Sequence, residues 1–376
     1  MEHVQKSRVS DVRLITSRTV VYTLMLTFSL LFGVLNFVIP THLLAAVIVI
    51  AVAGILLFLY PFLGLLSYQF ITVIKPAVIF PSLAVLHPER MMAIFLIVSL
   101  IINIKLRREK LIVTEHKLIY LIGFFILAMG LSVPTSYWPS QSVDKIIDFL
   151  KLFAYVLLII NILRTPKRLK IFVWQFLILI GYMAVSSAIA YKTGNVMEAQ
   201  GIIRAQGLAK TDPNTLANTL VLALPFHFML LKQEKNKILK MLSAFLVLAT
   251  VYTMVLTGSR GGMLGLIAVV IASWFVLPNK GIRMFFLLAA AFTVIAMMPQ
   301  QYQERYASIV AEDRDESSQQ RLKVWGKGLR MFIDRPFTGV GTGAFSIANA
   351  EGYSEGRKSY LAPHSLYIQL IAELGI

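Results

Sequence analysis

The sequence offers one histidine and a few arginines as candidates for chemistry, all of them beside long apolar segments. His364 follows Pro363 at the start of an apolar run, and Arg260 lies in the glycine-rich stretch LTGSRGGMLGL. A neutral imidazole can accept a proton from a hydroxyl group near pH 7. A guanidinium can offset the negative charge that develops on a leaving group, and each such donor is worth about 3 kcal/mol. These residue types favour displacement of a pyrophosphate by a hydroxyl group.

Arg204 and Asn214 belong to a second candidate anion site. In the segment RAQGLAKTDPNTLAN, Thr211 or Asp212 can cap the next helix, and Pro213 suits its first turn. Because a helix N-terminus attracts anions, Arg204, Asn214 and this helix start can together hold a phosphate. The same residues also make an ordinary structural cap, so the pattern alone leaves both interpretations open.

Arg260 and Arg321 each have a functional and a structural interpretation. Arg260 lies between two apolar runs with almost no loop to solvate it, and its glycine neighbours leave the guanidinium uncrowded. We favour a functional Arg260 over one that snorkels to lipid headgroups, because polar groups pressed against a bilayer are functional candidates. Arg321 opens an expected amphipathic helix, where it is either a ligand or a solvated residue.

No motif of a soluble enzyme, a metal centre or a cofactor site is present in the sequence. The chain has no cysteine, no HExxH and no GxxxxGK[ST] motif, and Asp313, Asp315 and Glu316 have the character of a solvated loop. The GVGTG segment at 339–343 lacks the strand-turn-helix context of a nucleotide cradle and predicts a tight external loop. We expect neither a metal nor a cofactor.

The composition is that of an integral membrane protein. Of 376 residues, 57% are hydrophobic and 15% are charged, and the mean hydropathy is +0.73. Because a soluble domain has about 25% charged residues, this composition excludes a soluble globular protein and a disordered one. Many of the basic residues behind the net charge of +17 lie in short links between apolar runs, where they hold loops on the cytoplasmic side. We therefore expect no nucleic-acid partner.

The apolar runs predict an all-α polytopic membrane protein with about 11–12 transmembrane helices. The run 43–74 has no charge and contains Tyr60-Pro61. A helix of that length would rise about 48 Å, too long for a core of about 30 Å, so we split it into two short crossings or a re-entrant pair. The other runs lie at 19–40, 91–104, 118–133, 146–163, 171–190, 216–231, 238–256, 261–277 and 284–298.

The positions of the basic residues orient these crossings. The N-terminal tail, Lys117 and the basic links hold 19 of the 36 Lys and Arg residues, and we place them in the cytoplasm. Those links are 104–110, 164–170, 232–240 and 279–283. The expected organisation is a cytoplasmic tail at 1–19, a transmembrane bundle at 20–299, one long outer-face loop at 300–363 and the start of a further transmembrane helix at 364–376.

The two C-terminal segments carry further expectations. In the loop, Leu322, Trp325, Leu329 and Phe332 recur at helical spacing, which predicts an amphipathic helix. This helix either lies on the outer leaflet or packs on the external ends of the crossings, and both interpretations stay open. The last 13 residues would span about 20 Å as a helix, less than a crossing needs, so we expect a truncated chain.

At these same residues the chain resembles the O-antigen ligase and O-antigen polymerase superfamily of bacterial envelope glycosyltransferases. The resemblance rests on the order and spacing of four stretches, at 204–226, 256–266, 321–345 and 363–375. It implies a multi-pass enzyme of the bacterial inner (cytoplasmic) membrane with its active face in the periplasm. The outer-face loop at 300–363 would then be periplasmic.

The resemblance also implies a reaction and roles for individual residues. A glycan passes from an undecaprenyl-pyrophosphate carrier to an acceptor hydroxyl, on a glycan or on lipid A core, with inversion and without a metal. His364 matches the proposed base, Arg204 and Arg260 match pyrophosphate-binding arginines, and Arg321 is a further candidate. The chain has Ser365 where family members usually have asparagine.

Other functions compete with this one. A protein O-glycosylating relative would have the same motifs, so ligase, polymerase and protein glycosylation stay open. A glycan or lipid flippase, or another polytopic transporter, would place ionisable residues near the bilayer midplane. Here the crossings are almost free of such charges, which favours chemistry at one face, and a passive scaffold does not explain Arg260. Besides the membrane lipids, the expected partners are the lipid-linked donor and the acceptor.

Overall fold

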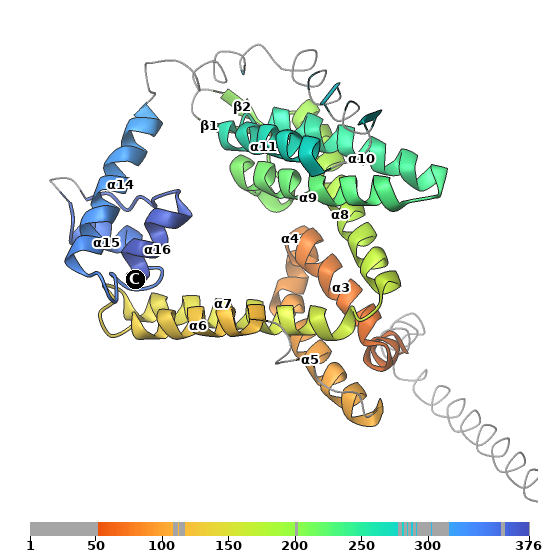
Figure 1. Ribbon diagram of the computed structural model, residues 1–376, viewed down its shortest axis with the longest axis horizontal. Helices are drawn as coiled ribbons and strands as arrows, with labels where there is room; N and C mark the ends of the chain where they lie inside the picture. Colours follow the sequence, from red (N-terminus) through yellow and green to blue (C-terminus); the bar gives the residue numbers. More distant parts are fainter. Residues whose placement is uncertain are drawn as a thin grey trace, which may run out of the picture. The chain divides into compact units, whose positions relative to one another are not determined.

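The structure is a computed structural model (Figure 1) that describes residues 52–107, 112, 117–199, 202–276, 280, 281, 284, 287, 288, 291, 302, 316–354 and 358–375. The chain forms two compact units, Met1–Leu63 and Gly64–Ile376, and each is described by itself. The predicted tail at 1–19 and the crossing at 19–40 lie outside the described residues. So do Asp313, Asp315 and most of the crossing expected at 284–298.

Helices dominate the described residues, and many of them begin at a proline, which suits the first helical position because its missing N–H has no partner there. In chain order the elements are α3 (Pro61–Ile74), α4 (Pro76–Ile79), η1 (Pro81–Leu86), α5 (Pro88–Arg107), α6 (Lys117–Leu131), α7 (Pro139–Ile162), α8 (Pro166–Lys192), β1 (Met197–Ala199), β2 (Ile202–Arg204), η2 (Leu208–Lys210), α9 (Pro213–Gln233), α10 (Lys237–Leu256), α11 (Arg260–Val276), α14 (Glu316–Asp334), α15 (Phe345–Glu351) and α16 (Leu366–Leu374).

The predicted class, an all-α polytopic membrane protein, is confirmed. Within the described ranges, α8, α9 and α10 are each long and apolar enough to cross a membrane, and α6 and α11 are shorter apolar helices. The break expected at Tyr60-Pro61 is present, because one helix ends at Leu59 and α3 begins at Pro61. An antiparallel hairpin of β1 and β2, with Met197 opposite Arg204, is an addition that the apolar pattern did not predict.

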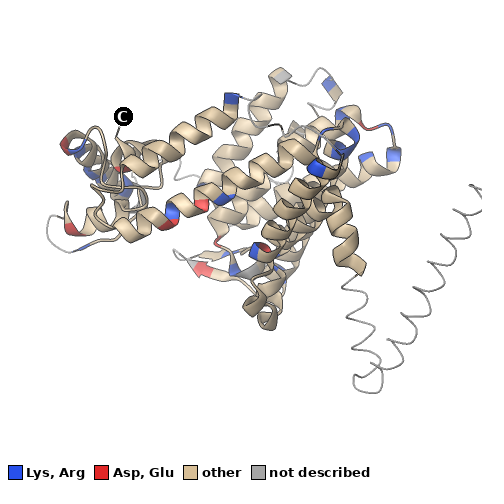
Figure 2. Ribbon diagram, turned by 90° about the horizontal axis from the view of Figure 1, so that it is seen from below, with Lys and Arg blue, Asp and Glu red and all other residues tan. Residues whose placement is uncertain are grey.

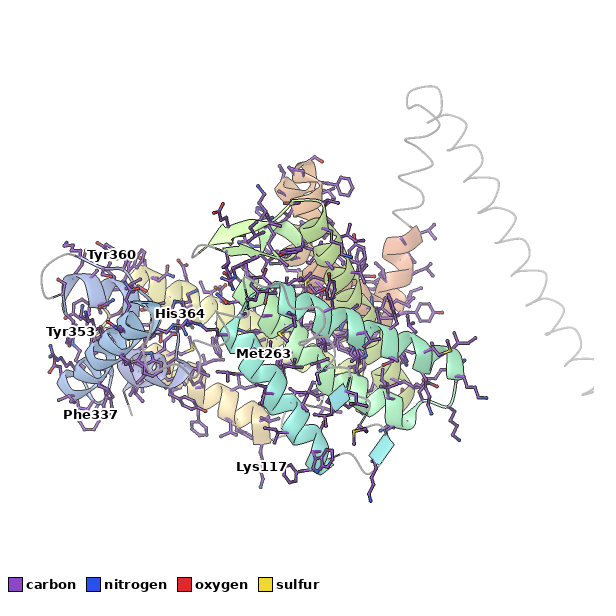
Figure 3. All side chains as sticks on the ribbon, turned by 90° about the horizontal axis from the view of Figure 1, so that it is seen from above. Lys117, Met263, Phe337, Tyr353, Tyr360 and His364 are labelled. Carbon is purple, nitrogen blue, oxygen red and sulfur yellow. The ribbon has the colours of Figure 1, made fainter. Side chains whose placement is uncertain are left out.

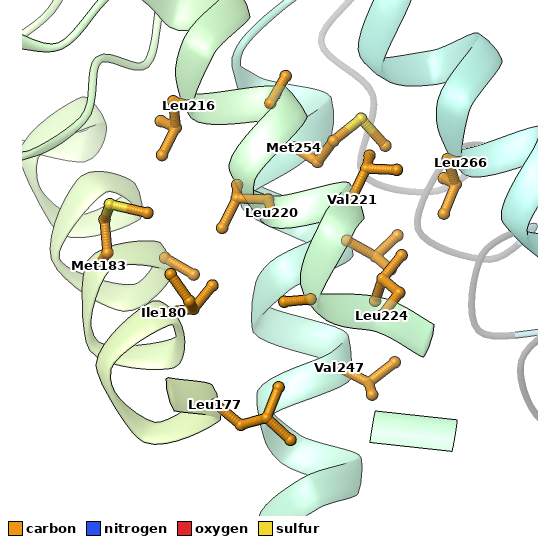
Figure 4. Packing of buried hydrophobic residues seen from close by; sticks show 14 of the residues in the cluster. Leu177, Ile180, Met183, Leu216, Leu220, Val221, Leu224, Val247, Met254 and Leu266 are labelled. Atoms are coloured by element: carbon orange, nitrogen blue, oxygen red, sulfur yellow. The ribbon is translucent and has the colours of Figure 1, made fainter. Parts of the chain in front are cut away.

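The core lies where α8, α9, α10 and α11 pack together (Figure 4). Leucine, isoleucine, valine and methionine side chains from all four helices fill it, among them Leu177, Leu220, Val247 and Leu266. Helix α11 approaches α9 closely at Gly262, where an added Cβ atom would lie 2.7 Å from Cβ of Ala217. Small residues at such contacts let membrane helices pack backbone to backbone. This contact fixes the start of α11, which carries Arg260.

Charged residues lie mainly at helix ends and in links, and long stretches of helix are free of them (Figure 2). Lys170 and Glu234 form an ion pair with a distance of 2.8 Å, so the basic links 164–170 and 232–240 lie side by side. At the other end of α10, Arg204 donates to the carbonyl of Thr257. The segment before α9 and the corner between α10 and α11 therefore meet at the opposite end of α10 from those basic links.

Helices α14, α15 and α16 form a second cluster, and α14 differs from its expected arrangement. Val324 and Met331 of α14 are buried apolar side chains, whereas Leu322 and Leu329 are exposed. The face that packs is thus offset from the predicted stripe, because α14 has apolar residues on two faces. The face with Val324 and Met331 packs against α15 and α16, as in the packed-helix interpretation. Leu322 and Leu329 lie on another face, which is exposed. Arg321 does not open the helix, since α14 begins at Glu316.

Candidate functional site

A cavity of about 400 Å³ brings together residues from three parts of the second unit. Its walls come from the start of α9, from the corner that joins α10 to α11, and from α14 together with the segment before α16. Three of the predicted site residues, Asn214, Arg321 and His364, lie in these walls. The full set of lining residues is Asn214, Asn218, Ser259, Gly261, Gln320, Arg321, Val324, Leu361, Ala362 and His364.

His364 lies directly before α16, on the side of the α14–α16 cluster that is turned toward α9 and α11 (Figure 3). Its side chain is exposed, and it forms no hydrogen bond or ion pair with any residue that the structure describes. Its backbone is left-handed, with φ of 49°. Such a conformation costs a non-glycine residue on the order of 1–3 kcal/mol and persists only where its surroundings hold it.

Trp325 supplies part of that support. Its indole Nε1 donates a 2.7 Å hydrogen bond to the carbonyl of Pro363, the residue before His364. Trp325 lies one helical turn after Arg321, so one stretch of α14 positions both the histidine and an arginine of the cavity. The sequence assigned Trp325 only to an apolar stripe. Its partner is 38 residues away, and no local pattern indicates that contact.

Arg321 contributes a positive charge to the cavity wall. The side chain is exposed and makes no ion pair with the described residues. Its guanidinium therefore keeps its donors for a ligand or for water. Of the two interpretations that the sequence left open, this placement favours the ligand, because Arg321 shares the cavity with His364.

Arg204 lies behind the wall rather than in it. Only 3% of its surface is exposed. Its Nε donates to the carbonyl of Thr257 at 2.6 Å, and its Nη2 donates to Oδ1 of Asn214 at 2.9 Å. The guanidinium thus joins the corner after α10 to the start of α9. This geometry connects Arg204 to the cavity through Asn214, and the role of Arg204 as a pyrophosphate ligand stays a prediction.

The bond from Arg204 orients the amide of Asn214. A guanidinium only donates hydrogen bonds, so the atom that it meets must be the amide oxygen. The amide nitrogen of Asn214 then points elsewhere, and it donates to no described residue. Because Asn214 is exposed and lines the cavity, these two N–H groups are donors for an anionic ligand.

The start of α9 is a structural cap, as one of the two interpretations predicted. Oδ2 of Asp212 accepts from the backbone N–H groups of Asn214 and Thr215, both at 2.9 Å, and Pro213 takes the first helical position. The carboxylate of Asp212 satisfies the donors that a phosphate would use and repels an anion there. An anion site near α9 must therefore use the Asn214 side chain rather than the helix N-terminus.

Arg260 begins α11 at the edge of the cavity. The residues on both sides of it, Ser259 and Gly261, line the cavity, while the half-buried Arg260 side chain does not. The corner before it is tight because Gly258 has φ of 57° and Oγ of Ser259 accepts from the N–H of Gly262. Arg260 is thus held next to the cavity, and its role in ligand binding stays a prediction.

Metal binding has no candidate site within the described ranges. Among those residues, no group of three or more His, Asp or Glu side chains converges to hold an ion. His227 is buried in the bundle, with Nδ1 2.9 Å from Oγ of Ser243. Independence of a metal stays a prediction for the reaction.

Fold and site together define a multi-pass α-helical membrane protein with a polar cavity that contains a histidine and an arginine. Residues 242–376 match the family model of the O-Antigen ligase domain, which supports the assignment of the chain to the O-antigen ligase and polymerase superfamily. The resemblance is thereby confirmed, and it indicates an enzyme of the membrane glycosyltransferase type. The matched range includes Arg260, Arg321 and His364 and begins after Asn214. Searches of curated proteins and of solved structures found no match.

Proposed function

We propose that the protein transfers a glycan from an undecaprenyl-pyrophosphate carrier to an acceptor hydroxyl at the periplasmic face of the bacterial inner membrane. The observation that carries this proposal is the cavity that contains His364, Arg321 and Asn214 together. It combines a proton acceptor with a cation and with neutral N–H donors. Displacement of a pyrophosphate by a hydroxyl group needs these groups.

The reaction proceeds in one displacement. His364 accepts the proton of the acceptor hydroxyl as its oxygen attacks the anomeric carbon from the side opposite the leaving group. The new glycosidic bond forms while the bond from that carbon to the pyrophosphate oxygen breaks, so the configuration inverts. The pyrophosphate leaves with the bonding electron pair, and the proton stays on the imidazole until solvent removes it.

The remaining residues act on the leaving group. Arg321 and the amide N–H groups of Asn214 stabilise the charge that develops on the pyrophosphate. Arg260 adds a second cation from the edge of the cavity, and Arg204 fixes the orientation of Asn214. No step in this scheme requires a metal, because proton transfer and charge stabilisation both come from side chains.

The acceptor defines three variants of this function. It is a sugar of lipid A core for a ligase, a growing surface polysaccharide for a polymerase, or a hydroxyl side chain for protein glycosylation. A flippase receives no support from α8, α9 and α10, whose charged residues lie near the helix ends. A transport path would instead place such residues near mid-membrane.

Reconstitution tests the proposal. The purified protein is placed in lipid vesicles with undecaprenyl-pyrophosphate glycan, an acceptor and a chelator. It should release undecaprenyl pyrophosphate and form a glycosidic bond with inverted configuration at the anomeric carbon. Movement of the lipid-linked glycan across the bilayer without a new glycosidic bond would identify a flippase and refute the transferase. Loss of transfer with chelator and recovery with added metal would refute the metal-independent mechanism.

A further inference from the structure

A second cavity, of about 650 Å³, adjoins the candidate site along α14. The two cavities share Gln320, Val324 and Leu361 in their walls. They are therefore neighbours on one surface, and a ligand longer than the first cavity can continue into the second. Neither the sequence motifs nor the family match assigns a role to the second cavity.

The second cavity is basic. Lys323, Lys327 and Arg330 line it from one face of α14, because residues at this spacing follow one another along a helix. Lys323 and Lys327 form no ion pair with a described residue. Glu351, which does not line the cavity, is paired with Lys358 at 3.8 Å. The lining thus presents cations without a described carboxylate to neutralise the two lysines.

The rest of the lining includes neutral polar groups. Asn349 is fully buried, and its Nδ2 donates to the carbonyls of Ser359 and Leu361. Its Oδ1 accepts no hydrogen bond within the described part of the chain. A buried acceptor without a donor is costly, and this oxygen lies beneath the surface of the wall, whereas the more exposed Ser359 presents a hydroxyl group to the cavity. Cations together with neutral polar groups in one lining suit a ligand with both acidic groups and hydroxyls.

We propose that the second cavity binds an anionic sugar, one that bears carboxylate or phosphate groups, as the part of the acceptor glycan that extends beyond the reacting hydroxyl. This inference rests on the proposed transferase function, because the hydroxyl of the same glycan must reach His364. The lysines hold the acidic groups, and the shared wall at Val324 and Leu361 connects the two binding regions. A neutral glycan gains nothing from these lysines.

Direct binding to the full-length protein in detergent tests the proposal without a need for activity. The probes are trigalacturonate for carboxylates, a phosphorylated maltotriose for phosphates, and maltotriose as the neutral match. At low salt, one or both acidic probes should bind at least about tenfold more tightly than maltotriose, and added salt should remove the difference. Equal affinity for all three probes would overturn the proposal. The tighter acidic probe identifies the kind of anion.

Variants locate the binding. The double change Lys323→Gln with Lys327→Gln should weaken the acidic probe by about tenfold, since each exposed pairing is worth up to about 1 kcal/mol. Lys151→Gln with Lys235→Gln removes the same charge outside both cavities and should leave that affinity unchanged. Equal weakening in both double variants would overturn the proposal.

A second probe separates this inference from the proposed function. Arg321→Gln should weaken binding of inorganic pyrophosphate and leave trigalacturonate affinity within about twofold, and the Lys323 and Lys327 double variant should do the reverse. Unaltered pyrophosphate binding in Arg321→Gln would count against the proposed function alone. Unaltered binding of the acidic sugars in the lysine variant would count against the second cavity alone.

Discussion

Trp325 holds the backbone at His364 through the carbonyl of Pro363, over a distance of 2.7 Å. The same helix carries Arg321, which shares the candidate cavity with that histidine. The proposed proton acceptor and a cation thus depend on one helix for their relative position. Their alignment with a substrate then follows from the packing of α14 rather than from either loop alone.

Trp325→Phe tests this support. The change keeps an aromatic ring and removes the indole donor, so the segment before α16 loses a hydrogen bond worth about 0.5–1.5 kcal/mol. Glycan transfer should fall by about five- to tenfold while pyrophosphate affinity stays within twofold. Trp138→Phe, at the start of α7, is the matched control. Equal activity of the two variants would exclude a positioning role for Trp325.

Arg204→Lys tests the link between Arg204 and Asn214. A lysine ammonium is a single point donor, so it cannot reproduce the two hydrogen bonds that separate guanidinium nitrogens make to Thr257 and Asn214. The variant should lose about 1–3 kcal/mol of stability, because a buried partner is left without its donor. It should also bind pyrophosphate more weakly.

A double-mutant cycle with Asn214→Ala separates the two effects of Arg204. If Arg204 acts through Asn214, pyrophosphate binding should weaken less than additively when the changes are combined. Strictly additive losses in isothermal titration would show instead that Arg204 contacts the anion independently.

Gly262→Ala tests the contact between α11 and α9. The new methyl group would lie 2.7 Å from Cβ of Ala217, so the helices must separate at a cost of about 1–3 kcal/mol. Gly261→Ala is the matched change, because nothing lies within 4 Å of its added Cβ atom. Thermal unfolding in detergent should give a clearly lower Tm for Gly262→Ala only. Equal Tm values for both variants would refute the close approach.

The ion pair between Lys170 and Glu234 predicts how stability depends on pH. The hydrogen bond from Lys170, followed by that from the backbone N–H of Asn236, lowers the pKa of Glu234 from an ordinary 4.5 to about 2. Because the folded pKa lies below the unfolded value, the pair contributes stability above pH 4.5 and loses it as the pH falls toward 2. Glu234→Gln should lower the Tm at pH 7 and reduce the loss between pH 4.5 and 3. An unchanged pH profile in the variant would contradict the assignment.

Local features of this fold could be predicted from the sequence. Asp212 and Pro213 cap α9 as their types predict, because a cap depends only on residues within one turn. The break at Tyr60-Pro61 was likewise predictable from helix length alone. The pairing of Arg204 with the start of α9 was anticipated as an anion site, and the described geometry makes it a support for Asn214.

Contacts between segments distant in the chain could not be predicted from the sequence. Trp325 and Pro363 are separated by 38 residues, and the choice of the packed face on α14 depends on α15 and α16. With apolar residues on two faces, helical spacing alone does not determine which face is buried. The sequence therefore identified the residue types of the candidate site, and tertiary packing decides which of them line the cavity.

The rate of glycan transfer by His364→Ala shows whether His364 accepts the proton of the acceptor hydroxyl. His87→Ala is the control, because His87 shares the left-handed backbone, with φ of 43°, and lies outside the cavity. In vesicles with undecaprenyl-pyrophosphate glycan and acceptor, we predict that His364→Ala loses at least about 100-fold in transfer rate. His87→Ala should keep the wild-type rate. A wild-type rate in His364→Ala would contradict the assignment of His364 as the proton acceptor.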